Sequence, residues 1–231
     1  MRDAQGPLDM TIPAEYLVEH YPSRGEKLAD GVVHAIGIVS AAAGGAVLVT
    51  LALNSRAEGL AAATGLYALC LLTMLGCSAA YNLSRPGAAR PFLQKLDEAG
   101  IFLMIAGSYT PFTTQRFTGA WSIGMTSLVW GVALAGVIGK LFVRKTPEWV
   151  WTAVYVGFGW LALVMIRPLL TDVRTSAFVL LVIGGLIYTT GTLVFHSQLP
   201  FRRAIWHGFV VAAASLHYVA IFTGVVLAAR A

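Results

Sequence analysis

The stretch Gly76–Phe112, GCSAAYNLSRPGAARPFLQKLDEAGIFLMIAGSYTPF, decides how this chain folds. It joins the end of one long apolar run to the start of the next through a short basic loop. Near that loop it carries Ser78, Tyr81, Asn82 and Asp97, polar side chains that a membrane interior disfavours unless each has a partner. These residues mark a candidate site, although polar residues at helix ends also occur simply because they face lipid head groups.

The composition is that of a protein embedded in a membrane. The chain has 231 residues, of which 57% are hydrophobic and 12% are charged, whereas a soluble domain carries about 25% charged residues. It contains seven uncharged runs, and all but the third and fifth exceed the ~20 residues that cross a bilayer. The runs are Gly31–Leu53, Gly59–Ser84, Ala99–Gln115, Phe117–Gly139, Trp149–Ile166, Thr175–Phe201 and Ala204–Ala229.

These runs favour helices over a membrane β-barrel, because they lack the alternation of polar and apolar residues that barrel strands show. A bilayer also forces backbone hydrogen bonding into each apolar segment. The sequence therefore predicts an all-α, polytopic bundle of seven transmembrane helices. We expect residues 1–30 to form a cytoplasmic tail and residues 31–231 to form the membrane domain.

Lysine and arginine are distributed unevenly between the two sets of loops. The side that holds the N-terminus has eleven: Arg2, Arg24, Lys27, Arg85, Arg90, Lys95, Lys140, Arg144, Lys145, Arg202 and Arg203. The other side has five: Arg56, Arg116, Arg167, Arg174 and Arg230. The positive-inside rule therefore predicts a cytoplasmic N-terminus and an extracytoplasmic C-terminus. Topology thus accounts for the net charge of +5, and no nucleic-acid partner is expected.

Polar residues gather at the predicted cytoplasmic ends of five spans, which suggests a shared pocket. Ser78 and Asn82 are four residues apart and so lie on one helix face. Asp97 is expected to open the third span, near the positive end of the helix dipole, and Pro111 to end or kink it. His217 lies about three turns deeper in the last span. The remaining members of the set are His34, His196, Arg203 and His207.

Four motifs resemble the hemolysin III branch of the progestin and adipoQ receptor family. They are GVVHAIG at 31–37, SAAYN at 78–82, LDEAGIF at 96–102 with its continuation to Phe112, and RAIWH at 203–207 followed by His217. The likeness covers nearly the whole chain, and the third-span motif is its most specific part. It implies a seven-span protein of a bacterial-type inner (plasma) membrane, with membrane lipids as partners and a role in membrane or lipid homeostasis.

The resemblance also implies a zinc ion held by three histidines, at positions that correspond to Asn82, Arg203 and His207. Asp97 and Ser78 are then the catalytic residues of lipid amide or ester hydrolysis, with a water between the metal and Asp97 as nucleophile. A zinc ion with three protein ligands and one open position suits that chemistry. This chain departs from the pattern at two of the three ligands, because Asn is a poor zinc ligand and Arg does not deprotonate to become one.

The departure leaves several hypotheses open. We expect Arg203 to pair with Asp97 and hydrogen-bond Asn82 in place of a metal; the alternative is that Arg203 extends to the cytoplasmic head groups. On the first view no cofactor is bound and the protein senses lipid or has a structural role. Zinc remains an option if His34, His196 and His207 form a rearranged ligand set in an active lipid hydrolase. A pore-forming cytolysin is suggested only by the name of the family.

Overall fold

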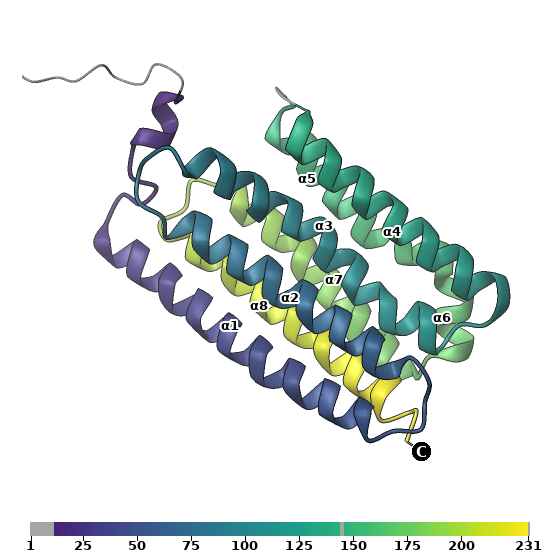
Figure 1. Cartoon of the computed structure of the whole chain (residues 1–231). Helices are drawn as coiled ribbons and strands as arrows, with labels where there is room; N and C mark the ends of the chain where they lie inside the picture. The colour runs from purple at the N-terminus through teal and green to yellow at the C-terminus, as the bar shows by residue number, and fades with distance from the viewer. Residues whose placement is uncertain (1–11, 144–145, 231) are drawn as a thin grey trace, which may run out of the picture.

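The computed structural model describes residues 12–143 and 146–230, and every element in these ranges is helical. Arg2, Arg144 and Lys145 of the charge count, and the first eleven residues of the predicted tail, lie outside them. Figure 1 shows the long helices side by side, with η1 at one end of the bundle and the C-terminus at the other. The elements are η1 (Ala14–Leu17), α1 (Arg24–Leu53), α2 (Leu60–Asn82), α3 (Arg90–Gln115), α4 (Gly119–Phe142), α5 (Glu148–Gly159), η2 (Trp160–Met165), α6 (Ile166–Asp172), α7 (Thr175–Phe195), α8 (Arg202–Ile221) and η3 (Phe222–Val226).

Six helical stretches among the described residues are long and apolar enough to cross a membrane. They are Arg24–Leu53, Leu60–Asn82, Gly119–Phe142, Glu148–Asp172, Thr175–Phe195 and Arg202–Val226. The predicted all-α bundle is therefore confirmed, and six of its seven predicted spans meet these criteria. The third predicted span falls in α3, which has 26 residues but is more polar. In Figure 1, α3 runs the length of the bundle between α2 and α4, and it packs against both.

Helix α3 differs from the predicted third span at both ends. It begins at Arg90 with Pro91 in its first turn, a position where the missing N–H of proline costs nothing. Asp97 therefore lies about two turns inside the helix, and the prediction that it opens the span is wrong. The helix also continues past Pro111 to Gln115. The sequence predicts that Pro111 either ends or kinks this helix, and the structure excludes the first of these two effects.

The fifth predicted span is interrupted where α5 gives way to the six-residue 3-10 segment η2. A change of helix type leaves backbone groups without their usual partners, and Tyr109 of α3 reaches two of them. Its hydroxyl lies 2.6 Å from the carbonyl oxygen of Gly159, to which it donates, and accepts a 2.8 Å hydrogen bond from the backbone N–H of Ala162. One side chain thereby stabilises the interruption.

Residues 14–22, which we call the N-terminal strap, cover one end of the bundle. The backbone carbonyl of Tyr16 accepts a 3.0 Å hydrogen bond from the N–H of Gly87, and the phenolic hydroxyl of Tyr16 donates a 2.7 Å hydrogen bond to Gln94. Arg90, whose side chain is fully buried, donates to the carbonyls of Val18 and Ser84. The strap is thus fastened to the loop between α2 and α3, at the end of the bundle that holds the predicted site (Figure 1).

Some helices approach one another closely at glycine residues. A Cβ added to Gly107 of α3 would lie 2.7 Å from Cys70 Cβ on α2, so the two backbones could not keep their separation. Cys70 is buried and Cys77 partly buried, and both are free thiols. By contrast, a Cβ at Gly131 on α4 would meet nothing within 4 Å. Close packing therefore depends on particular glycines and not on the abundance of glycine.

The contrast between these two glycines gives a matched test of the α2–α3 interface. We expect Gly107→Ala to lower the free energy of unfolding by about 1–3 kcal/mol, because the added methyl group overpacks the interface. Gly131→Ala should leave stability unchanged or slightly raised, since alanine favours a helix over glycine. Thermal unfolding of the purified proteins in detergent checks both. Equal midpoints for the two variants would contradict the assigned packing.

Candidate functional site

A buried cluster of three titratable side chains, here called the α1–α8 cluster, joins the first and last long helices. Asp30 and His34 lie one turn apart on α1, and His207 comes from the first turns of α8. Their exposed fractions are 0%, 2% and 7%. Asp30 Oδ1 lies 2.6 Å from His207 Nδ1, and Asp30 Oδ2 lies 3.5 Å from His34 Nε2. The two imidazole rings are 4.3 Å apart between centroids.

The strap closes this cluster from the side of the N-terminus. Tyr21 is buried and its hydroxyl donates to Asp30 Oδ2. Burial, together with the hydrogen bond to Asp30 and its charge, raises the pKa of Tyr21 above its ordinary value, so the phenol stays protonated and remains a donor. Asp30 therefore has a partner on each of its two oxygens, one from the strap and one from α8.

The second ring nitrogen of His207 faces a different group of residues. Its Nε2 lies 3.4 Å from the hydroxyl oxygen of Ser78 on α2. Asn82, one turn further along α2, donates from its side-chain amide to Ser78 and, at 3.4 Å, to Asp97 Oδ2. Arg203 of α8 donates to Asn82 Oδ1 at 2.9 Å. The structure thus joins five of the predicted residues in one series of hydrogen bonds that starts at Nε2 of His207.

The predicted contact between Arg203 and Asn82 is present, but the predicted pairing of Arg203 with Asp97 is not direct. Among the described residues, Asn82 stands between the two charged groups and bonds to each through a different atom of its amide. We call this arrangement the Arg203–Asn82–Asp97 chain. The primary amide can serve both partners because it offers a donor and an acceptor. The guanidinium group of Arg203 therefore points towards Asn82 of α2, as the first of the two hypotheses expects.

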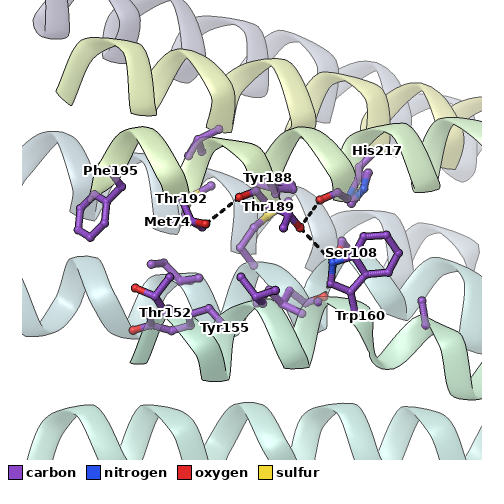
Figure 2. Close-up of a pocket in the computed structure, with 18 of the residues that line it drawn as sticks. Met74, Ser108, Thr152, Tyr155, Trp160, Tyr188, Thr189, Thr192, Phe195 and His217 are labelled. Carbon is purple, nitrogen blue, oxygen red and sulfur yellow. Dashed lines mark hydrogen bonds between the residues drawn. The ribbon is translucent and has the colours of Figure 1, made fainter. Parts of the chain in front are cut away.

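A cavity of about 360 Å³ opens beside this chain and runs between α3, α5, α7 and α8. Asn82, Asp97 and Arg203 line one end of it. Figure 2 shows the stretch beyond, with Phe195 and Thr152 towards one side of the view and His217 and Trp160 towards the other. Most of the wall is apolar, including Met74, Ile101, Ile105, Leu163, Met165, Leu169, Leu181 and Val210.

Charged groups concentrate at the end of the cavity that holds Arg203. There Lys140 Nζ lies 2.6 Å from Glu98 Oε2, and Gln94 donates to the other oxygen of Glu98 at 3.0 Å. Further along the wall, the buried hydroxyl oxygen of Tyr188 has no hydrogen-bond partner among the described residues. The cavity is therefore amphiphilic, with charges at one end and an unpaired hydroxyl farther along its apolar wall.

The other predicted site residues lie apart from the α1–α8 cluster. His196 is exposed at the C-terminal end of α7 and lies 2.9 Å from Thr152 Oγ1, so the set His34, His196 and His207 is not brought together. His217 lies deeper along α8, 3.2 Å from the carbonyl oxygen of Leu181, and lines the cavity. Tyr81 lines the polar end of the cavity and packs against His20 of the strap.

Sequence reasoning missed Asp30 and Tyr21. Both fall in the predicted tail, because the sequence pattern places the end of the tail where the charged residues stop. Helix α1 instead begins at Arg24, with Ser23 as its N-cap accepting from the N–H of Glu26. The spacing of Asp30 and His34, four residues apart on one helix face, was a signal that could have identified the pair.

The three positions that correspond to the implied histidine ligands do not fit a metal ion. Beside His207 they present the guanidinium group of Arg203 and the side-chain amide of Asn82, which hydrogen-bond to each other and bring a positive charge instead of a metal ligand. A zinc ion needs deprotonated nitrogen, sulfur or carboxylate ligands. The residues present there bind one another instead.

Comparison with known proteins gives one family. The model of the family described as haemolysin-III related matches residues 26–218. The chain is 28% identical to the hemolysin-3 homolog of Bacillus subtilis (strain 168) over 80% of this chain and 88% of that protein. It is 29% identical to hemolysin-3 of Bacillus cereus, over 84% of this chain and 89% of that protein. It is also 29% identical to the human monocyte to macrophage differentiation factor, over 87% of this chain and 85% of that protein.

The Arg203–Asn82–Asp97 chain can be tested through stability. We expect Arg203→Ala to lower the free energy of unfolding by about 1–3 kcal/mol, because it leaves the buried Oδ1 of Asn82 without a donor. Among the described residues, the neighbouring Arg202 donates only to the carbonyl of Ser197, so Arg202→Ala is the matched control and should cost about 0.5–1.5 kcal/mol. Thermal unfolding in detergent measures both. A wild-type midpoint for Arg203→Ala would contradict the inward placement of this side chain.

Proposed function

Because this chain belongs to the haemolysin-III related family and is an integral membrane protein, we propose that it binds a membrane lipid and acts in membrane lipid homeostasis. The observation that carries the proposal is the cavity, which has apolar walls and a charged end. Its volume of about 360 Å³ lies within the range of about 300–1,000 Å³ that small-molecule sites occupy. An apolar chain with a polar head group is the ligand whose shape and polarity match it.

The placement of the protein in the membrane is part of the proposal. We take α3 as a seventh span, supported by its length of 26 residues and its position between α2 and α4. The excess of Lys and Arg on one side supports a cytoplasmic N-terminus and an extracytoplasmic C-terminus. In this orientation the charged end of the cavity faces the cytoplasm, and the resemblance favours a bacterial inner membrane.

The polar groups along the cavity favour one orientation of the lipid. Arg203, Asn82 and Asp97 offer both donors and acceptors to a head group at the cytoplasmic end. The unpaired hydroxyl of Tyr188 is available to a polar group nearer the middle of the molecule, such as the amide or ester where head and chain join. Beyond it, the apolar wall suits the hydrocarbon chain, whose burial is favourable at roughly 25 cal/mol per Å².

The same geometry favours binding over zinc-dependent hydrolysis. At the family-matching positions, Asn82 and Arg203 form a degenerate zinc site, because they hydrogen-bond each other where ligands would be needed. The alternative, a metal-dependent hydrolase with rearranged ligands, has less support: His196 lies apart, and neither His34 nor His207 lines the cavity. For a cytolysin the only support is the name of the relatives in Bacillus.

The proposed lipid site can be tested with two matched substitutions on α7. Thr192 lines the cavity, whereas Thr190 is exposed on the outer face. In the part of the chain that the structure describes, each hydroxyl donates only to backbone carbonyls of α7. We expect Thr192→Phe to reduce the amount of lipid that co-purifies with the protein at least about threefold, because the ring occupies the space of the chain. Native mass spectrometry of both variants and extraction of the bound lipid measure the effect. If Thr190→Phe removes as much lipid, or if neither variant changes it, the cavity is not the lipid site.

A further inference from the structure

Beyond lipid binding, we propose that Asp30, His34 and His207 form a structural binding site for a divalent transition-metal ion such as Zn²⁺, which fastens α1 to α8. The site lies on the Nδ1 side of His207. It shares His207 with the family-matching positions, but Asn82 and Arg203 are connected to the opposite nitrogen of that ring, Nε2, through Ser78.

The donor set suits such an ion. One carboxylate oxygen and two imidazole nitrogens are common ligands of zinc and of its neighbours among the divalent metals. One ligand atom from each of the three side chains lies within 4.8 Å of the others, and all three side chains are buried. Ligands about 2.0–2.1 Å from a tetrahedral ion lie roughly 3.3 Å apart, so small side-chain rotations bring these atoms to that spacing.

An unpaired nitrogen provides an independent indication of a missing partner. His34 Nε2 is buried, and it has no hydrogen-bond partner among the residues that the structure describes. The nearest acceptor, Asp30 Oδ2, lies 3.5 Å away and is already bonded to Tyr21. A buried polar atom without a partner loses its hydrogen bonds to water and forms none within the protein, which costs free energy. A cation between His34, Asp30 and His207 would supply that partner.

The surroundings favour a structural ion over a catalytic one. None of the three side chains lines the cavity, so an ion held by them would not face a lipid bound there. Tyr21 of the strap donates to the carboxylate of Asp30, as residues next to a metal ligand commonly do to fix its orientation. Three protein ligands leave the fourth position of a tetrahedral ion open, so the structural role rests on the burial of the ligands and on their separation from the cavity.

Metal content and stability of the wild-type protein decide the proposal first. The full chain, purified in detergent without chelators, should carry about one divalent transition metal per chain by plasma mass spectrometry. Removing the metal with a chelator should lower the unfolding midpoint, and adding Zn²⁺ alone should restore it. If the protein holds no metal and Zn²⁺ does not change the midpoint, the cluster is only a hydrogen-bonded network and the proposal fails.

Three variants then locate the ion. His34→Asn should weaken Zn²⁺ binding at least about tenfold. His217→Asn, which alters a histidine of α8 outside the cluster, and Arg203→Ala, which alters the Nε2 side of His207, should keep wild-type affinity. Loss of binding in Arg203→Ala with retention in His34→Asn would overturn the assignment. Should His34→Asn fail to fold, Asp30→Asn, which keeps a hydrogen-bonding oxygen for Tyr21, replaces it with the same expected loss.

The lipid proposal and the metal proposal fail separately. Filling the cavity with Thr192→Phe should leave Zn²⁺ binding intact, and His34→Asn should leave the co-purifying lipid unchanged, since His34 does not line the cavity. A single variant that removed both ligands while the protein stayed folded would show that the two sites are one, and it would overturn the structural role assigned to the ion.

Discussion

Buried polar groups in an apolar helix bundle must find their partners within the protein, and this constraint organises one end of the molecule. His207 is its centre, because its two ring nitrogens face two different sets of residues. Nδ1 meets Asp30 of α1, and Nε2 meets Ser78 of α2. From there the Arg203–Asn82–Asp97 chain continues to α3. Four helices are thus joined by polar contacts at one depth, while a core of buried apolar side chains extends through the bundle.

The same constraint explains why the cavity is amphiphilic. Its charged end exists because Arg203 and Asp97 are held apart by Asn82, which leaves part of each group facing the cavity. Its apolar wall includes the 3-10 segment η2, whose irregular backbone is satisfied by the hydroxyl of Tyr109. A straight helix there would not need that partner. The family motif that contains Tyr109 therefore contributes to the shape of the proposed lipid site.

Much of the fold was predictable from the sequence, because uncharged runs report burial in a membrane directly. The sharing of one face by Ser78 and Asn82, and the contact of Arg203 with Asn82, followed from helical spacing and from the need for a partner. Three features did not follow. The distribution of charged residues places Asp30 in the tail, whereas helix α1 already begins at Arg24. Residue type alone could not show that Asn82 separates Arg203 from Asp97. Nor could it show that His196 faces Thr152, because the rotation of α7 is set by packing.

The proposed function depends most on the orientation of a lipid in the cavity, with its head group at Arg203 and its chain running towards His217. A photoactivatable single-chain lipid, with the reactive group at the methyl end of the chain, tests this orientation in nanodiscs containing the purified protein. Mass spectrometry of the cross-linked peptides should find the label on residues at the far end of the cavity, such as Leu169, Leu181 and His217. Labelling confined to the exposed outer faces of α1 and α4, at residues such as Val39 and Leu134, would contradict it.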